Sequence, residues 1–218
     1  RRTIAVVSCR PEEGKTTTAV NLAVVIAQSG KKVLLVDCDL HRPKVHEMTG
    51  LKAEPGLTSV LIGEAKWPDV CGTIVHNGIP IENLSVMPAG PGSPNPAELL
   101  SSQRMKDLLT EFRGAYDWVI VDTPPILFVS DASVISAECE GVVWVIKAGS
   151  VHRSLLNRAN EQLANVHAHI IGAVLNAMSV SRVGRNYSNY YYHGYATYSK
   201  DYHRSYYDRS GGAKGPDG

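Results

Sequence analysis

The sequence predicts an α/β fold, a three-layer α/β/α sandwich with a mostly parallel, doubly wound sheet. Through residues 1–178, short apolar runs alternate with longer segments of helical periodicity, which is the pattern of strands buried on both faces of a parallel sheet. The 218 residues are 44% hydrophobic and 20% charged, as in a globular domain with a sizeable core. Crossovers of this length are right-handed, and ligands are expected at the carboxyl ends of the strands.

Each expected strand is a short apolar run, and each expected helix is a longer segment between two runs. The first run begins at the start of the chain, and the last ends near residue 176. The expected strands are Ile4–Ser8, Val33–Asp37, Leu84–Pro88, Trp118–Asp122, Val142–Lys147 and Ile170–Asn176, and the helices include Thr16–Gln28, Ala97–Phe112 and Ser154–Asn165.

Composition excludes several function classes. Lys and Arg number 22 and Asp and Glu 21, so the net charge of +1 gives no bulk attraction to nucleic acid or an anionic membrane, and no nucleic-acid partner is expected. No run approaches the roughly 18 to 20 apolar residues of a membrane span, and the chain opens on a strand, so we expect a soluble domain excised from a longer protein. The cysteines lack a C-x-x-C pair, which argues against a zinc site or disulfide scaffold and indicates buried small hydrophobes at Cys9, Cys38, Cys71 and Cys139.

The composition changes abruptly after Met178. Residues 179–218 hold six Lys or Arg, three Asp and no Glu, without an apolar period, so they cannot form a core of their own. We therefore predict two regions, a folded domain at 1–178 and a flexible tyrosine-rich tail at 179–218. Nine of the ten tyrosines lie in the tail: Tyr187, Tyr190, Tyr191, Tyr192, Tyr195, Tyr198, Tyr202, Tyr206 and Tyr207.

The turn after the first strand has the character of a nucleotide phosphate-binding loop. A strand, a tight loop ending in Gly-Lys-Thr and a helix are expected in that order. Backbone N–H groups of such a loop point at the phosphates, the lysine reaches the β and γ phosphates, and the threonine hydroxyl ligates magnesium. The pattern G-x-x-x-x-G-K-[ST] would place its first glycine at Cys9, so a plain helix N-terminus remains the alternative. The predicted nucleotide-binding residues are Arg10, Pro11, Glu12, Glu13, Gly14, Lys15, Thr16 and Thr17.

Three aspartates follow two other strands. Asp37 and Asp39 stand two residues apart at the end of one strand, so their side chains point the same way. Such a pair can hold magnesium and a reacting hydroxyl or water. Asp122 ends the strand Val119–Val121 in the form of a Walker B aspartate. Singly, each could be a helix cap or a surface carboxylate, but after a phosphate loop they favour a shared magnesium site.

These segments together resemble the bacterial tyrosine kinases of the exopolysaccharide type. That family belongs to the deviant-Walker P-loop ATPases, which also include division-site and chromosome-partitioning ATPases. The resemblance spans essentially the whole chain and is specific because the tyrosine cluster accompanies the nucleotide motifs. It is carried by Ser8–Thr17, by VLLVDCDLHRP at 33–43, by Asn95–Leu100, by VIVDTPP at 119–125 and by the tyrosine-rich tail.

The resemblance implies a role for each residue of the site. Lys15 and Thr16 bind the ATP phosphates and Mg²⁺, and Asp39 and Asp122 complete the magnesium shell directly or through water. Asp37 orients or deprotonates the incoming tyrosine. The four residues predicted to be catalytic are therefore Lys15, Asp37, Asp39 and Asp122, and the metal is predicted at Thr16, Asp39 and Asp122.

Five further residues stand at positions that the resemblance singles out. Arg10 stands where the partitioning ATPases carry a signature lysine, and a solvated loop arginine is the alternative. Asn176 matches an adenine-contacting position of the class, and a turn-forming asparagine is the alternative. Glu12 replaces a glycine that is usual in the family, and a carboxylate there is tolerable only if it points to solvent. His41–Arg42 stands where Arg-Arg or Arg-Lys is common.

The resulting prediction is an ATP- and Mg²⁺-dependent tyrosine kinase that phosphorylates the tail tyrosines of a neighbouring subunit and regulates exopolysaccharide synthesis or export. The resemblance implies a homo-oligomeric ring and a membrane chain-length regulator as activator, fused or separate. It also implies an opposing tyrosine phosphatase and a cytoplasmic location at the inner face of the membrane. A positioning ATPase and a nucleotide-switched adaptor, neither of which phosphorylates protein, remain open alternatives.

Overall fold

The computed structural model describes residues 2–76 and 78–178. The compact unit that carries the sheet is Arg1–Asn176. The predicted tail and its tyrosines lie outside the described residues, so the boundary at 178 and the flexibility of 179–218 stay predictions. The elements are β1 Arg2–Ser8, α1 Lys15–Gln28, β2 Val33–Asp37, α2 Val45–Thr49, α3 Leu57–Leu61, η1 Trp67–Val70, β3 Val75–His76, β4 Ile79–Pro80, β5 Leu84–Met87, α4 Pro96–Ser101, α5 Gln103–Ala115, β6 Trp118–Asp122, α6 Asp131–Glu138, β7 Gly141–Lys147, α7 Arg153–Asn165 and β8 Ile170–Asn176.

The main sheet has six strands in the order β5-β2-β6-β1-β7-β8, and every pair is parallel. The predicted doubly wound parallel sheet is therefore confirmed. β1 lies in the interior of this sheet, between β6 and β7. The loop that follows β1 therefore lies near the middle of the row formed by the carboxyl ends of the strands. On neighbouring strands Asp37 of β2 stands opposite Asp122 of β6. The sheet alone thus brings two of the predicted acids together.

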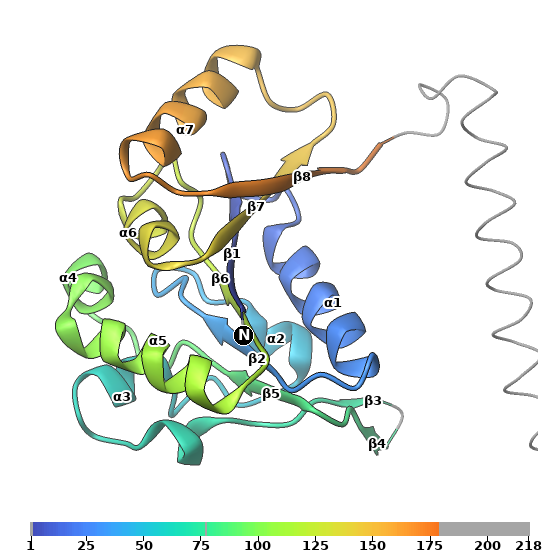
Figure 1. Ribbon diagram of the computed structural model, residues 1–218, viewed down its shortest axis with the longest axis vertical. Helices are drawn as coiled ribbons and strands as arrows, with labels where there is room; N and C mark the ends of the chain where they lie inside the picture. Colours follow the sequence, from blue (N-terminus) through green and yellow to red (C-terminus); the bar gives the residue numbers. More distant parts are fainter. Residues whose placement is uncertain (1, 77, 179–218) are drawn as a thin grey trace, which may run out of the picture. The chain divides into compact units, whose positions relative to one another are not determined.

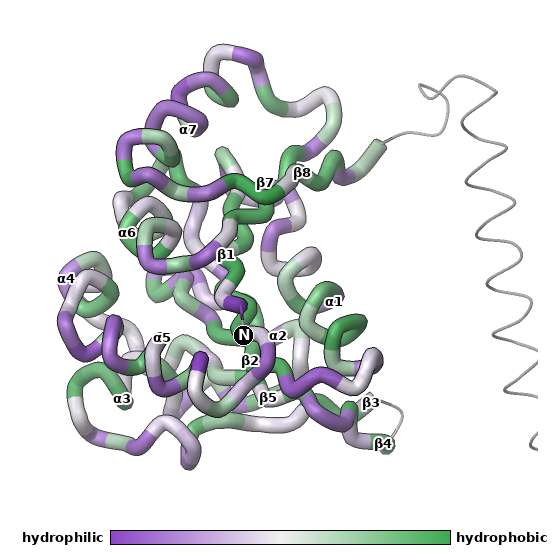
Figure 2. The backbone as a smooth tube through the Cα atoms, viewed as in Figure 1, coloured by the Kyte–Doolittle hydropathy of each residue, from purple (hydrophilic) through white to green (hydrophobic). Residues whose placement is uncertain are grey.

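Alternate residues of each central strand pack into two separate cores, which gives the three layers. Ile4 and Val6 of β1 face a core that includes the buried side of α1, whereas Ala5 and Val7 face a core built with α5, α6 and α7. Figure 1 shows α1 on one side of the sheet and α4 to α7 on the other. In Figure 2 hydrophobic residues gather in the strands, and most of α7 is hydrophilic.

Two predicted elements differ from the structure. The helix predicted at Ala97–Phe112 is two helices, because Ser102 leaves helical geometry at φ −65° and ψ 155° and its hydroxyl accepts a hydrogen bond from the N–H of Met105. It caps α5 in this way. The strand β8 forms as predicted but is not buried on both faces. It lies at the edge of the sheet, and Ile171 and Leu175 are exposed.

Three of the four cysteines are buried as predicted, and Cys71 is not. All four are free thiols, and Cys9, Cys38 and Cys139 are buried, with Cys71 half-buried. Burial raises the pKa of the Cys71 thiol to about 11, so it stays protonated at neutral pH. In the described ranges 2–76 and 78–178, no helix combines the length and the apolar character needed to cross a membrane.

Candidate active site

The loop between β1 and α1 adopts the shape of an anion-binding turn. Gly14 has φ +91° and Glu12 φ +63°, so two residues of the loop are left-handed. A Cβ on Gly14 would lie 2.1 Å from Nδ2 of Asn176, and no side chain caps the start of α1. The first N–H groups of a helix lack partners within that helix. The N-terminus of α1 therefore offers its N–H groups and its positive dipole end to a ligand.

Glu13 and Asn176 hold this loop in place through hydrogen bonds. The Glu13 carboxylate is buried, and its Oε2 accepts a hydrogen bond of 3.0 Å from the N–H of Cys9. Burial raises the pKa of Glu13. The side-chain amide of Asn176, at the end of β8, donates a hydrogen bond of 2.9 Å to the carbonyl oxygen of Glu13. Glu13 thus shapes the loop from inside, and Asn176 joins β8 to it.

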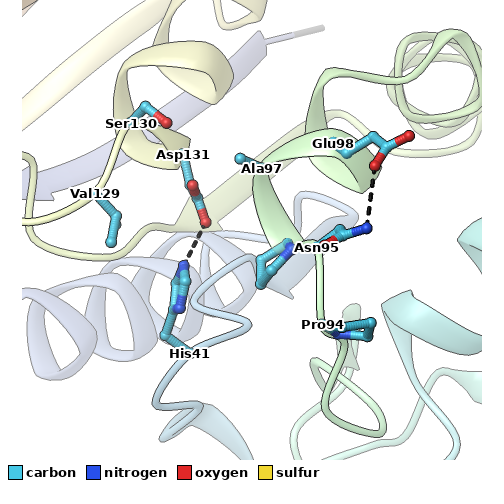
Figure 3. A pocket seen from close by; sticks show the side chains of 9 residues that line it. His41, Pro94, Asn95, Ala97, Glu98, Val129, Ser130 and Asp131 are labelled. Atoms are coloured by element: carbon cyan, nitrogen blue, oxygen red, sulfur yellow. Dashed lines mark hydrogen bonds and ion pairs between the residues drawn. The ribbon is translucent and has the colours of Figure 1, made fainter.

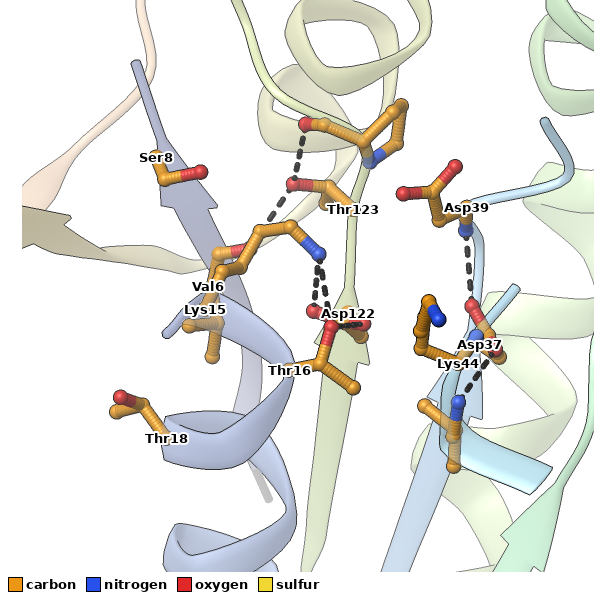
Figure 4. Close-up of polar contacts among 12 residues, drawn as sticks. Val6, Ser8, Lys15, Thr16, Thr18, Asp37, Asp39, Lys44, Asp122 and Thr123 are labelled. Carbon is orange, nitrogen blue, oxygen red and sulfur yellow. Dashed lines mark hydrogen bonds and ion pairs between the residues drawn. The ribbon is translucent and has the colours of Figure 1, made fainter. Parts of the chain in front are cut away.

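Lys15, Thr16 and Asp122 form one cluster of polar contacts (Figure 4). Nζ of Lys15 lies 2.6 Å from Oδ1 of Asp122, and the hydroxyl of Thr16 donates to Oδ2 of Asp122 at 2.7 Å. Asp122 is fully buried, and Thr123 beside it donates to the carbonyl oxygen of Val6, which joins the end of β6 to β1. The structure therefore brings the predicted lysine, threonine and Walker B aspartate into direct contact.

Asp37 occupies a different position from the other acids. It is fully buried, and its carboxylate accepts hydrogen bonds from the backbone N–H groups of Asp39, Lys44 and Val45 at 3.0 to 3.1 Å. Burial, and next the charge of Asp122, raise the pKa of Asp37 to about 7. Its carboxylate fastens the loop that follows β2 and the first turn of α2, and it does not line the cavity described below.

Asp39 faces the cavity that Asp37 does not reach. Its Oδ1 accepts a hydrogen bond of 3.0 Å from the N–H of Arg42, and the residue is 7% exposed. In Figure 4 the Asp39 side chain extends beyond Asp37 at the same edge as Lys15. The sequence spacing predicts both aspartates on the same side of one strand, but β2 ends at Asp37. Asp37 therefore has a structural position, and Asp39 lines the cavity.

A cavity of about 510 Å³ opens over these residues, a size usual for small-molecule sites. Four of its lining side chains are cationic, those of Arg10, Lys15, Arg42 and Lys44, and two are anionic, those of Glu12 and Asp39. This balance favours an anionic ligand. Glu12 is exposed but also lines the cavity, so its carboxylate lies beside the place where an anionic ligand would bind. The cavity is also lined by Ser8, Pro11, Gly14, Thr16, Thr17, His41, Met48, Pro124, Pro125, Phe128 and Val129.

Several lining residues were not predicted. Lys44, Met48, Phe128 and Val129 lie in segments that follow β2 and β6, outside any motif. Lys44 is a cation near two motif aspartates and could have been suspected from that spacing. Phe128 carries no signal in the sequence, because its place depends on how the chain leaves β6 and crosses toward β1.

A second hollow of about 450 Å³ adjoins the first, since His41 and Val129 line both. It lies between the loop after β2, the segment before α4 and the start of α6 (Figure 3). Nε2 of His41 and Oδ2 of the buried Asp131 are 2.8 Å apart. The loop after β2 is thereby joined to α6.

The residues present fit a magnesium ion that is shared with phosphates. Mg²⁺ prefers oxygen ligands, and in nucleotide sites one or two carboxylates complete a shell made mostly of water and phosphate oxygens. The hydroxyl of Thr16 and the carboxylate of Asp122 are in contact, and Asp39 lies at the same edge. Within residues 2–76 and 78–178 no group of three or more His, Cys, Asp or Glu side chains could hold a metal by itself.

Comparison with known proteins agrees with this geometry. Residues 1–151 match the family model described as an AAA domain. Tyrosine-protein kinase YwqD of Bacillus subtilis is 42% identical over 193 residues, covering 88% of this chain and 78% of that protein. The succinoglycan biosynthesis transport protein ExoP of Rhizobium meliloti is 32% identical over 90% of this chain, which corresponds to 25% of ExoP. The solved kinase domain of the Escherichia coli tyrosine kinase ETK superposes with a TM-score of 0.75 at 33% identity, covering 82% of this chain and 70% of that one. With a phosphate loop, a Walker B aspartate and these relatives, the chain belongs to the bacterial tyrosine-protein kinases, within the P-loop family of AAA domains.

Proposed function

We propose that the cavity binds ATP with Mg²⁺ and that its residues direct the γ-phosphate to tyrosines of the segment 187–207 on a neighbouring subunit. One observation carries this proposal: Lys15, Thr16 and Asp122 are in mutual contact at the N-terminus of α1, beside the cavity-lining Asp39. Phosphoryl transfer depends on positioning and on charge neutralisation, and this group of residues is arranged for both.

Each residue has a distinct task in this proposal. Lys15 gives its ammonium group to the β and γ phosphates, and the N–H groups at the start of α1 bind the same anions. Mg²⁺, when bound, neutralises phosphate charge and orients the reacting groups. Thr16, Asp39 and Asp122 would hold that ion. Arg10 is the additional cation that we assign to the phosphates, and Asn176 the residue that we assign to adenine.

Asp37 and Asp39 have different tasks toward the tyrosine that accepts the phosphate. Asp39 lines the cavity, so its carboxylate can accept a hydrogen bond from a tyrosine hydroxyl. Asp37 accepts three backbone N–H groups of the loop that carries Asp39. We therefore assign the orienting effect of Asp37 to its hold on this loop, which makes it a positioning residue. A base within hydrogen-bond reach of the acceptor hydroxyl is the geometric requirement for proton removal.

Our proposal extends to the cellular setting, which membership of the family supports. The chain acts in a homo-oligomeric ring at the inner face of the cell membrane, with a membrane chain-length regulator as activator and a tyrosine phosphatase as opponent. Its task is the control of exopolysaccharide synthesis or export, and the relative ExoP bears succinoglycan biosynthesis in its name. Each phosphate adds about −1.5 to −2 charge, so phosphorylation reverses the sign of the basic tail and releases subunits from one another.

Intact-mass analysis after incubation with ATP and Mg²⁺ tests the enzymatic part. The expected result is several added phosphates, all mapping to tyrosines between Tyr187 and Tyr207. Lys15→Met should remove them, and replacement of the nine tail tyrosines by Phe should remove the acceptor while ATP binding remains. ADP release without protein phosphorylation would instead indicate a positioning ATPase. If neither ADP nor phosphorylated protein forms, the nucleotide-switched adaptor is the remaining alternative.

A further inference from the structure

Phe128 is an unusually exposed aromatic residue at the mouth of the proposed active site. The chain has two phenylalanines. Phe112 is fully buried in the core, whereas Phe128 is 63% exposed and lines the cavity. Among the described residues that line this cavity, Phe128 is the one Phe, Tyr or Trp side chain. Phe128 does not stand alone, because the exposed side chain of Met48 and the side chain of Val129 line the same cavity, and exposed apolar residues gathered at one site, unlike scattered ones, mark an interaction surface.

The backbone fixes Phe128 to the phosphate loop. After β6 the chain crosses toward β1, and the N–H groups of Ile126 and Leu127 donate to the carbonyl oxygens of Ser8 and Cys9 at 2.9 and 3.4 Å. Phe128 follows directly, so its position is tied to the loop that is proposed to hold the phosphates. A residue placed in this way can set the position of a second ligand relative to the first.

The strand that leads to Phe128 and the strand that ends at the proposed adenine position lie on opposite sides of β1 in the sheet. Asn176 ends β8, which follows β7 on one side of β1. The apolar lining residues Met48, Phe128 and Val129 come from segments that follow β2 and β6, on the other side of β1. Asn176 and the apolar rim thus come from strands on opposite sides of β1, so in our proposal a group that approaches the terminal phosphate does so from the rim.

The chemistry of tyrosine matches such a rim. Its ring needs an apolar or aromatic partner, and its hydroxyl must reach the phosphate and Asp39 deeper in the cavity. Aromatic pairs are stabilising beyond the area they bury. Serine and threonine have no ring to pack on Phe128, and their hydroxyls sit on a short stem that ends near the backbone. A ring at the rim therefore favours tyrosine in both binding and reach.

We propose that Phe128, with Met48 and Val129 lining the same cavity, forms the surface that receives the aromatic ring of the acceptor tyrosine and restricts transfer to tyrosine. This inference rests on the proposed function, since it needs the terminal phosphate of ATP at Lys15 and Thr16. It adds the residue that selects the acceptor, which neither the nucleotide motifs nor the predicted catalytic residues supply.

A peptide that spans residues 196–201 is a suitable probe. It holds Tyr198 between Thr197 and Ser199, so tyrosine competes with both other hydroxyl residues in one molecule. With the full chain, ATP and Mg²⁺, we expect phosphate on Tyr198 alone. Phe128→Ala should lower kcat/KM for this peptide by about tenfold, mainly through KM, which corresponds to the upper range of an aromatic pair. Phe128→Tyr should restore kcat/KM to within about threefold, because it keeps the ring.

Two further measurements separate acceptor binding from catalysis. Fluorescence anisotropy of the labelled peptide should show tighter binding than its Tyr198→Ser version, and Phe128→Ala should remove that difference. ADP affinity should be the same in Phe128→Ala and wild type. Val25→Ala is the matched control, because Val25 is also 63% exposed but lies on α1 and does not line the cavity.

Different outcomes overturn different claims. Equal peptide binding and equal kcat/KM in wild type and Phe128→Ala would overturn the role of Phe128 while leaving the kinase assignment intact. Loss of ADP binding in Phe128→Ala would show that the rim contacts the nucleotide, and it would also overturn the role of Phe128 in binding the acceptor tyrosine. If the wild-type chain phosphorylates neither its own tail nor the peptide, the proposed function fails, and the inference fails with it.

Discussion

The buried ion pair between Lys15 and Asp122 permits a quantitative test of how the site is built. Nζ of Lys15 lies 2.6 Å from Oδ1 of Asp122, and the two side chains are 7% and 0% exposed. Removing one partner of a buried pair leaves the other charge without compensation, which costs about 3 to 5 kcal/mol of unfolding free energy. The neighbouring carboxylate of Asp37 repels Asp122, so we expect the cost of Asp122→Ala near the lower limit.

The double substitution decides whether the pair is coupled. Lys15→Met and Asp122→Ala should each lower the free energy of unfolding by about 3 kcal/mol. Together they remove both charges, so the double variant should be little less stable than either single one. The coupling free energy is then about 2 to 3 kcal/mol, within the range found for residues in direct contact.

Urea unfolding at neutral pH, followed by tryptophan fluorescence, measures all four free energies. Lys106 and Glu138 form the control pair, with Nζ and Oε1 3.2 Å apart and the side chains 47% and 33% exposed. Its coupling should stay below about 1 kcal/mol, since solvent screens exposed pairs. A Lys15–Asp122 coupling no larger than that of the control would refute the argument that burial makes this contact strong.

The raised pKa of Asp37, about 7, means that the folded carboxyl keeps a proton that the unfolded chain loses above about pH 4. Stability is therefore expected to fall between about pH 4 and 7, and Asp37→Asn should flatten this part of a series of urea midpoints. A Gly14→Ala side chain would lie 2.1 Å from Nδ2 of Asn176 at a φ of +91°, whereas Gly30→Ala, at a φ of +83°, meets open space. ADP affinity should fall by about tenfold or more in the first variant and stay unchanged in the second, so equal affinities in a fluorescence titration would argue against the loop geometry. Asp39→Asn should raise the Mg²⁺ concentration needed for ADP binding, and an unchanged Mg²⁺ titration would remove Asp39 from the metal shell.

The sequence could predict the phosphate loop and its partners because their geometry is local. A strand followed by Gly14, Lys15 and Thr16 at the start of a helix has few arrangements open to it. Asp122 ends a neighbouring parallel strand, and carboxyl ends of such strands meet at one edge. The contact of Asp122 with Lys15 and Thr16 follows from these two facts.

The different fates of Asp37 and Asp39 could not be predicted in the same way. Their spacing places both carboxylates on one side of an extended strand. In the structure the strand ends at Asp37, and the chain returns so that the N–H groups of Lys44 and Val45 bind the Asp37 carboxylate. Which of two equivalent-looking aspartates is buried thus depends on the path of the loop, and the sequence pattern does not contain that path.

Local patterns specify the parallel sheet, the phosphate loop and the acids at its edge, because they consist of apolar periodicity and of residues adjacent in the chain. The set of side chains that complete the cavity depends instead on long-range packing. Phe128 reaches it through hydrogen bonds from Ile126 and Leu127 to Ser8 and Cys9, more than a hundred residues away in the chain. Contacts of such separation depend on the packing of the whole sheet, and a local pattern carries no record of them.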